Sequence, residues 1–411
     1  MLSFFSYHCK SNHLFKYLQK FFLILFAFIL NHNIIAQNSN GINIYKAEDA
    51  IVGASRLELY LSHLQNKNVG IVANQTSIFN GTHLIDTLLS EGINIKKIFT
   101  PEHGFRGTAD EGAAINNGID EKTQLPIISL YGNNKKPNQE QLKDIDIIVF
   151  DLQDVGVRFY TYISTMTYVM EAAAENNIPI IVLDRPNPNG FYVDGPVLEK
   201  ENASFVGLHQ VPVVYGLTIG EYAMMVNGEF WLKDSLQCDL EVVPLGNYDR
   251  NGIYELPVKP SPNLPNWESV YLYPSLCFFE GTIVSVGRGT ESPFQLYGHP
   301  LMKEKYTFTP KQSEGRKAPL LCNQVCHGEL LIDYAHNYNL NKNELKLTWL
   351  INAYNQLKDN DKFFNNFLVK LTGTKTLEEQ IKSGLNEEEI RKSWEPKLNE
   401  YKKIRKKYLV Y

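Results

Sequence analysis

The stretch Ile145-Asp146-Ile147-Ile148-Val149-Phe150 is an almost uninterrupted apolar run that leads directly into Asp151-Leu152-Gln153-Asp154. A run of this length, rich in β-branched residues, is typical of a strand that is buried on both faces of a sheet. Four similar runs lie in the first half of the chain, at Val69–Ala73, Ile95–Phe99, Pro126–Leu130 and Ile178–Leu183. Because stretches with helical spacing separate several of them, we predict an α/β fold with a Rossmann-like parallel sheet and helices on both faces.

The dinucleotide site of such folds is missing from the sequence. The first predicted strand runs into Asn74-Gln75-Thr76-Ser77, and no Gly-x-Gly-x-x-Gly motif follows it. A phosphate-binding loop that ends in Gly-Lys-Ser/Thr does not occur either. We therefore expect the fold without a nucleotide, and no cofactor.

The pattern changes beyond about residue 195. Thr218-Ile219-Gly220-Glu221 has the spacing of a capping box at the start of a helix, and Ile283–Val286 is interpreted as a strand. The last fifty residues have the apolar spacing of amphipathic helices. We expect residues 45–195 to form the Rossmann-like domain and residues 196–411 a smaller α+β domain, with the active site in the cleft between them.

The N-terminus has the layout of a secretory signal. Three lysines precede the apolar run Phe21–Leu30, and a small residue, Ala36, follows it. The run is shorter than the ~20 residues that a membrane-spanning helix needs. We interpret residues 1–36 as a cleaved signal peptide, with an uncleaved signal anchor as the alternative. The mature protein is then exported to the periplasm or secreted, without a membrane anchor.

Composition excludes some classes of partner and of site. The chain of 411 residues has a net charge of −5, which is not the basic excess of a nucleic-acid-binding protein. Four cysteines follow the signal, and Cys322 and Cys326 are close enough in the sequence to form a disulfide. With His327 they resemble half of a zinc site, but a second pair of ligands is missing, so we expect no metal.

Polar side chains follow three of the predicted strands at the point where each strand ends. In a parallel sheet these ends meet at one edge, where ligands bind. The residues delivered to that edge are Glu102, His103, Arg106, Asp151, Asp154, Arg158, Tyr160, Asp184 and Asn187. Carboxylates, fixed hydrogen-bond donors and aromatic surface are together what a sugar site needs.

Several of these residues also have a purely structural explanation. Asp154 and Asp184 are placed where an aspartate often caps the following helix, and Arg158 is placed to form an ion pair with a nearby aspartate. Glu102 is harder to explain in this way, because it follows Pro101 in a tight loop and not on a solvated helix face. It is therefore the strongest candidate for a functional carboxylate.

A second group of polar residues lies in the later half of the chain. Glu280 follows two phenylalanines and precedes Gly281, and such apolar surroundings favour a protonated carboxyl. A protonated carboxyl beside an ionised one is the pair that glycosidases use. The alternative is a structural ion pair between Glu280 and Arg288 across one strand.

Five of these segments resemble the motifs of a known family. They are Pro101–Gly107, Asp151–Tyr162, Asp184–Pro188, Glu280–Thr282 and Gly287–Thr290. The chain is similar over about residues 45–411 to the NamZ-type exo-β-N-acetylmuramidases, which form glycoside hydrolase family 171. The resemblance implies a Rossmann-like N-terminal domain, a smaller C-terminal domain and an active site in the cleft between them. It also implies release of N-acetylmuramic acid from the non-reducing end of peptidoglycan fragments.

The motif residues can then be given roles. We interpret Glu102, Asp151 and Glu280 as catalytic carboxylates, with Glu102 the strongest of the three. The residues interpreted as substrate-binding are His103, Arg106, Asp154, Arg158, Tyr160, Asp184, Asn187 and Arg288. The lactyl carboxylate of the substrate needs a cation, for which the candidates are Arg106, Arg158 and Arg288.

The sequence leaves the mechanism and two other functions open. A second carboxylate can attack the sugar, a water can do so, or the 2-acetamido group of the substrate can assist. A non-catalytic protein that binds cell-wall glycans on the same scaffold is the main alternative, and it predicts that a strand-end carboxylate is lost. An esterase would need a Gly-x-Ser-x-Gly motif, which does not occur. The expected partners are muramyl-glucosamine oligosaccharides.

Overall fold

The computed structural model describes residues 43–46, 49–102, 105, 117–312, 319–338, 341–359 and 362–411. The predicted signal peptide, residues 1–36, lies outside the described residues and stays a prediction. Residues Ile42–Tyr411 form one compact unit. Within the described ranges, every helix is too short or too polar to cross a membrane.

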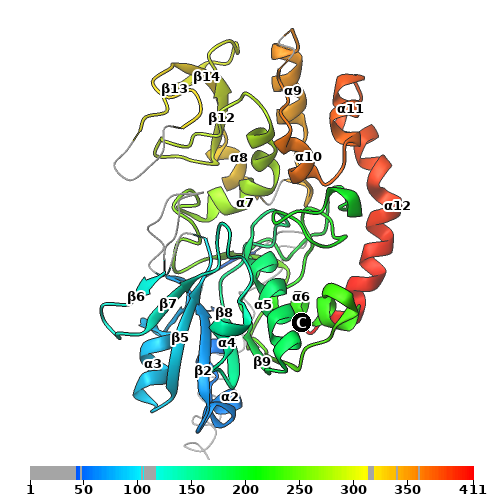
Figure 1. Ribbon diagram of the computed structural model, residues 1–411. Coiled ribbons are helices and arrows are strands. Elements are labelled where there is room, and N and C mark those ends of the chain that lie inside the picture. The colour runs from blue at the N-terminus through cyan, green and yellow to red at the C-terminus, as the bar shows by residue number, and fades with distance from the viewer. Residues whose placement is uncertain are drawn as a thin grey trace, which may run out of the picture. The chain divides into compact units, whose positions relative to one another are not determined.

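A seven-stranded sheet dominates the first part of the chain (Figure 1), with the strand order β10-β9-β8-β2-β5-β7-β6. All neighbours pair in parallel except β6 and β7. The strands are β2 (Asn68–Ala73), β5 (Asn94–Thr100), β6 (Gly118–Ile119), β7 (Pro126–Ser129), β8 (Ile147–Asp151), β9 (Ile180–Leu183) and β10 (Leu240–Val243). The chain adds β5 and β7 on one side of β2 and then β8, β9 and β10 on the other. This is the doubly wound order of Rossmann folds, as predicted.

Helices cover both faces of this sheet, because both faces of its strands are apolar. In β8, Ile147 and Val149 pack against α2 (Leu57–Leu64) and α3 (Leu84–Ser90). Ile148 and Phe150 point the other way, into the core that contains α5 (Tyr162–Asn176) and α6 (Ile219–Gly228). A short helix, α4 (Gln139–Leu142), precedes β8. Each fully buried side chain of this kind contributes about 1.5–3 kcal/mol to the stability of the fold.

The predicted capping box begins α6. The Thr218 hydroxyl accepts a hydrogen bond from the Glu221 amide at 3.2 Å, and the Glu221 carboxylate accepts one from the Thr218 amide at 2.9 Å. Two otherwise unpaired donors at the helix start are thereby satisfied.

The second part of the chain is mixed α and β. Its three-stranded antiparallel sheet has the order β12-β14-β13, with β12 (Leu296–His299), β13 (Tyr306–Phe308) and β14 (Cys326–Leu330). The helices of this part are α7 (Trp267–Leu276), α8 (Ile332–His336), α9 (Thr348–Leu357), α10 (Phe367–Thr372), α11 (Thr376–Lys382) and α12 (Glu387–Arg405). Two small sheets, β1 (Asn43–Lys46) with β11 (Gly252–Glu255) and β3 (Ile78–Phe79) with β4 (Thr82–His83), complete the strands of the described ranges.

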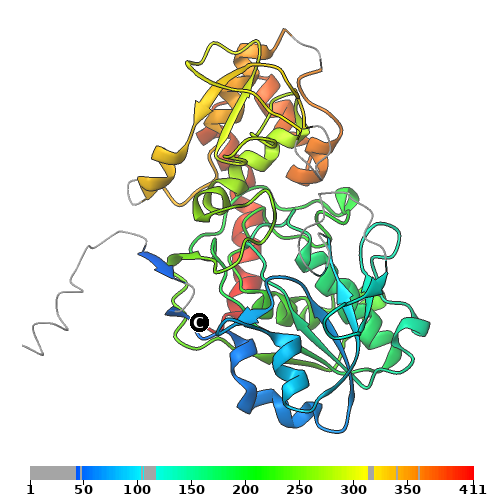
Figure 2. The ribbon, with the colours of Figure 1, turned by 90° about the vertical axis from the view of Figure 1, so that its left-hand side faces the viewer.

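Helix α12 connects the second part with the parallel sheet, as Figure 2 shows. Near its end, the Tyr401 hydroxyl donates to the Tyr215 carbonyl at 2.7 Å, and the Arg405 guanidinium donates to the Gly216 carbonyl at 2.6 and 2.9 Å. The predicted division into residues 45–195 and 196–411 stays a prediction. The parallel sheet itself continues beyond residue 195, since β10 is its edge strand.

The second part of the chain lacks a strand at Ile283–Val286 and a disulfide between Cys322 and Cys326. The strand predicted over Ile283–Val286 is wrong: Ser285 forms only an isolated bridge with Gly298, while Val284 and Val286 are buried in the core. A short apolar run looks the same in a strand and in a buried loop. Cys322 and Cys326 are free thiols in this structure, so the disulfide that their spacing permits is not formed. The described residues contain no cluster of three side chains suited to a metal ion.

Gly156 provides a test of the packing between two strand-end loops. Its φ of +78° is left-handed, and an added Cβ would overlap the side-chain amide of Asn187. We expect Gly156→Ala to lower the free energy of unfolding by at least about 2 kcal/mol, because backbone strain and overlap add. The measurement is urea denaturation.

Gly92→Ala is the matched control. Gly92 has a similar φ of +76°, but an added Cβ would meet nothing within 4 Å. Its substitution should cost only the strain of a left-handed alanine, about 1 kcal/mol. Equal losses in the two variants would show that the contact with Asn187 is unimportant.

Candidate active site

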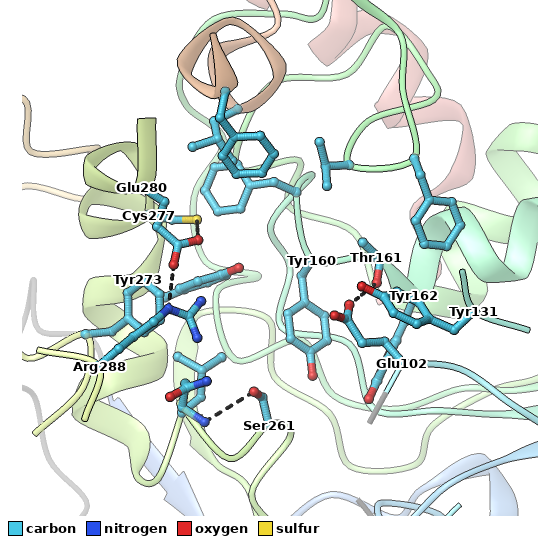
Figure 3. Close-up of a pocket in the computed structure, with 18 of the residues that line it drawn as sticks. Glu102, Tyr131, Tyr160, Thr161, Tyr162, Ser261, Tyr273, Cys277, Glu280 and Arg288 are labelled. Carbon is cyan, nitrogen blue, oxygen red and sulfur yellow. Dashed lines mark hydrogen bonds and ion pairs between the residues drawn. The ribbon is translucent and has the colours of Figure 1, made fainter. Parts of the chain in front are cut away.

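A cavity of about 430 Å³ lies at the carboxyl end of the parallel sheet, between the two parts of the chain (Figure 3). Its walls come from the loops after β5, β7 and β8, from the ends of α7 and α10, and from loops between them. The lining residues with polar or charged side chains are Glu102, Tyr131, Lys135, Tyr160, Thr161, Tyr162, Ser261, Asn263, Tyr273, Cys277, Glu280 and Arg288. Cavities of this size hold small ligands.

Glu102 lies on one wall of the cavity. It follows β5 by two residues, and its carboxylate accepts a hydrogen bond from the Thr161 hydroxyl at 3.4 Å. Thr161 is the residue before the first turn of α5. The carboxylate therefore lies near a helix N-terminus, where unpaired amides carry a partial positive charge.

Two buried tyrosines form the floor beside Glu102. The hydroxyls of Tyr160 and Tyr162 both donate to the Pro260 carbonyl, at 2.7 and 3.5 Å, and their rings meet edge to face at 4.8 Å. Burial, and to a lesser degree the charge of Glu102, raises the pKa of Tyr162. Burial likewise raises the pKa of Tyr160. Both phenols therefore remain neutral at physiological pH and fix the loop at Pro260 against the strand ends.

Glu280 lies on the opposite wall, in a short helical turn over Cys277–Gly281 that continues α7 (Figure 3). Its carboxylate accepts a hydrogen bond from Arg288 Nε at 2.6 Å and one from the Cys277 thiol at 3.7 Å. The Arg288 guanidinium also lies 4.9 Å from the ring centre of Phe294. The surroundings of Glu280 were predicted to be apolar, but in the structure they also contain the guanidinium cation of Arg288.

The predicted site residues divide into three groups in the structure. Glu102, Tyr160, Glu280 and Arg288 line the cavity. His103 and Arg106 lie outside the described residues, so their assignment stays a prediction. The other five are buried beside the cavity and do not line it; they are Asp151, Asp154, Arg158, Asp184 and Asn187.

Asp151 and Asp184 are each held by partners within the fold. Both oxygens of Asp151 accept hydrogen bonds from Arg185, at 2.5 and 2.9 Å. Asp184 accepts hydrogen bonds from the hydroxyls of Thr218 and Tyr411, at 2.7 and 2.8 Å, and from a backbone amide of α6. Partners within the fold therefore occupy Asp151, which was predicted to be catalytic, and Asp184, which was predicted to bind substrate.

Arg158 and Asn187 bond to backbone carbonyls in place of a ligand. The Arg158 guanidinium donates to Pro196, Val211 and Leu371 at 2.7 to 2.8 Å. It has no ion pair with an aspartate among the described residues, so the Asp–Arg pair considered as the structural explanation of Arg158 is wrong, whereas its role in substrate binding stays a prediction. Asn187 donates to the Leu217 carbonyl at 2.7 Å.

The cavity does not lie at the point where the strand order reverses. That crevice, between β2 and β8, is where doubly wound folds usually bind ligands. Here it is filled by side chains that bond to one another: the Ser77 hydroxyl donates to the Asp151 carbonyl at 2.5 Å, and the Asn74 amide donates to the Tyr162 hydroxyl at 2.8 Å. The cavity lies beside this network, at the ends of β5 and β8.

Sequence reasoning overlooked several lining residues. Tyr131 and Lys135 lie in the loop after β7, whose carboxyl end lies at the same edge of the sheet as that of β5. Applying the strand-end rule to this strand as well would have found them. Phe205 and Tyr273 had no comparable signal, because no recognisable motif surrounds them.

Two carboxyl side chains that face each other across an aromatic-walled cavity are the arrangement of a glycoside hydrolase. Comparison with known proteins narrows this class. The models of the exo-β-N-acetylmuramidase NamZ match the chain in two parts, the N-terminal model over residues 69–268 and the C-terminal model over residues 271–411. The chain therefore belongs to the NamZ family of exo-β-N-acetylmuramidases.

Individual relatives agree with this family. The peptidoglycan β-N-acetylmuramidase NamZ of Bacillus subtilis strain 168 is 40% identical over 380 residues, which cover 86% of this chain and 89% of that protein. Crystal structures of two DUF1343 family proteins from Bacteroides fragilis superpose with TM-scores of 0.80 and 0.73. These are 44% and 29% identical to this chain, and each comparison covers 88% of this chain and 99% of the other.

Asp154 yields a prediction about pH and stability. One of its oxygens accepts hydrogen bonds from the Gly156 amide and the Tyr215 hydroxyl, and the other has no partner among the described residues. Burial raises the pKa of Asp154 from 3.8 to about 7, although these hydrogen bonds act in the opposite direction. Between these two values the folded protein holds a proton that the unfolded chain has released. Stability therefore falls as the pH rises through this window.

We expect the free energy of unfolding of the wild type to fall between pH 5 and pH 7.5. In Asp154→Asn, which has no titrating group at this position, the fall should be smaller by about 2 kcal/mol. Denaturant titrations at several pH values measure the difference. Burial also raises the pKa of Asp184, to about 6, but this contribution is common to both proteins. Parallel pH profiles would mean that Asp154 is ionised throughout.

Proposed function

We propose that this protein is an exo-acting glycoside hydrolase that releases N-acetylmuramic acid from the non-reducing end of peptidoglycan fragments. The single observation that carries the proposal is the placement of Glu102 and Glu280 on opposite walls of one cavity. Membership of the NamZ family supports the substrate, since the Bacillus subtilis relative is a peptidoglycan β-N-acetylmuramidase. The substrates would be muramyl-glucosamine oligosaccharides.

The surroundings of the two carboxyls suggest different roles. Glu280 accepts a hydrogen bond from the Arg288 guanidinium at 2.6 Å, which fixes the orientation of its carboxylate on the cavity wall. Glu280 would then stabilise the positive charge that develops on the sugar, directly or through a water. Glu102 accepts a hydrogen bond from the neutral Thr161 hydroxyl at 3.4 Å, and it would protonate the glycosidic oxygen of the departing sugar.

This division of roles has a kinetic signature in the leaving group. We expect Glu102→Gln to lower kcat/KM for a muramyl-glucosamine disaccharide by about 10³, because the departing alkoxide needs a proton. With an aryl β-N-acetylmuramide whose phenol is strongly acidic, the loss should be much smaller. Glu280→Gln should reduce turnover of both substrates. For every variant, release of N-acetylmuramic acid is measured by mass spectrometry.

Glu121→Gln is the matched control, because Glu121 is exposed and lies outside the cavity lining. It should retain full activity. Full activity of Glu102→Gln would remove Glu102 from catalysis, and equal losses on both substrates would remove its role as acid. If the wild type releases no N-acetylmuramic acid from either substrate, the proposed function is wrong.

We also propose that the protein is exported and that its signal peptide is removed after Ala36. The support is the short apolar run behind three lysines at the N-terminus. Expression of the full chain in a bacterium with two membranes, followed by fractionation, should place the protein in the periplasm. Intact mass should then show a chain that begins at Gln37. A full-length chain retained in the cytoplasm or in the inner membrane would contradict export.

A further inference from the structure

Lys135 is the second cation that lines the cavity. Among the described lining residues, the charged side chains are Glu102, Glu280, Arg288 and Lys135. Arg288 is ion-paired with Glu280, whereas Lys135 has no ion pair with a described residue. The cavity therefore presents one cation whose charge is not already matched by a neighbouring carboxylate of the described chain.

An aromatic ring holds this lysine in place. Its Nζ lies 4.6 Å from the centre of the Phe205 ring, and Phe205 stacks on Tyr168 of α5 with the ring centres 6.0 Å apart. A cation over a ring is held by the electron-rich face, which leaves its N–H donors available to another partner. The adjacent Lys136 is engaged elsewhere, by Glu171 and Glu175.

We propose that Lys135 binds the carboxylate of the lactyl group of the substrate and thereby selects muramic acid over glucosamine. The inference rests on the proposed function and adds a specificity-determining residue to it. The two sugars differ by the lactyl ether, whose carboxylate is an anion that a cavity must match with a cation. Arg158 and Arg288, two candidates from the sequence, are occupied by backbone carbonyls and by Glu280.

The position of Lys135 fits this role. Lys135 lies in the loop after β7, and β7 pairs with β5, which delivers Glu102. The residues that recognise the lactyl carboxylate and the residue that acts on the glycosidic oxygen therefore come from neighbouring strand ends. Both lie on the lining of one cavity, together with Tyr131 and Phe205.

The test compares two aryl β-N-acetylmuramides, one with the free lactyl carboxylate and one with the corresponding primary amide. We expect the wild type to prefer the carboxylate by about tenfold in kcat/KM, the effect of one hydrogen bond to a charged group. Lys135→Met should abolish this preference through a higher KM for the carboxylate substrate, with kcat and the amide substrate little changed. Lys135→Arg should retain a preference, because the positive charge remains.

Lys136→Met is the matched control, since it removes the same charge from the next residue, which is paired with Glu171 and Glu175. It should keep the wild-type preference. A measurement on the wild type alone tests for a cation at the lactyl carboxylate without relying on a folded variant: added salt should raise KM for the carboxylate substrate and leave KM for the amide substrate unaffected. Thermal unfolding checks that each variant is folded.

An unchanged preference in folded Lys135→Met, or equal salt dependence of the two substrates, would overturn the proposal. Failure of the proposed function looks different, because the wild type would then hydrolyse neither substrate. In that case calorimetric binding of N-acetylmuramic acid and its lactyl amide decides the role of Lys135. Equal affinities of the wild type and Lys135→Met for the acid would also overturn it.

Discussion

The buried guanidinium of Arg158 is the interaction on which the shape of the cavity depends. The side chain is inaccessible to solvent, and it donates to the carbonyls of Pro196, Val211 and Leu371. A buried charge costs several kcal/mol of desolvation, which these carbonyl dipoles offset. The aromatic wall begins at the next residue, Phe159, and Leu371 belongs to α10 on the far side. One cation thus ties the end of the parallel sheet to the second part of the chain.

The polar network at the strand ends explains why the cavity lies where it does. Asp151 and Asp184 are occupied by Arg185, Thr218 and Tyr411, so the crevice at the centre of the sheet is closed by internal bonds. Hydrogen bonds from these partners offset the cost of burying the two carboxylates. The cavity that contains Glu102 and Glu280 lies to one side of this network, where the loop at Pro260 is fixed by two tyrosine hydroxyls.

The sheet was predictable because its strands are buried on both faces. The run Ile145–Phe150 is one of several that alternate with stretches of helical spacing, and this repeated alternation indicates a parallel sheet. The capping box at Thr218 specifies a helix start by its own hydrogen bonds. The run Ile283–Val286 was ambiguous, because its valines are equally apolar in a core loop. Local sequence pattern therefore decides an element only where it excludes the alternatives.

The site was predictable in part. The strand-end rule says which edge of the sheet a residue reaches, and it placed Glu102 and Tyr160 at the cavity. It does not say whether the residue faces the cavity or forms hydrogen bonds with a neighbouring loop. The partners of Asp184 include Tyr411, which is 227 residues away in the chain. Lys135 was overlooked for a related reason, since its aromatic partner Phe205 belongs to a distant segment with no motif of its own.

The residues of the cavity wall come from widely separated parts of the chain, so they are synthesised at different times. Glu102 emerges early in synthesis, Glu280 in the second half, and Phe367 and Leu371 of α10 close to the end. An N-terminal fragment that ends before Phe367 lacks the α10 side of the wall, even though it contains both carboxyls. Turnover of a glycan therefore reports folding of the chain through α10, and a nascent chain would have no hydrolase activity before α10 is made.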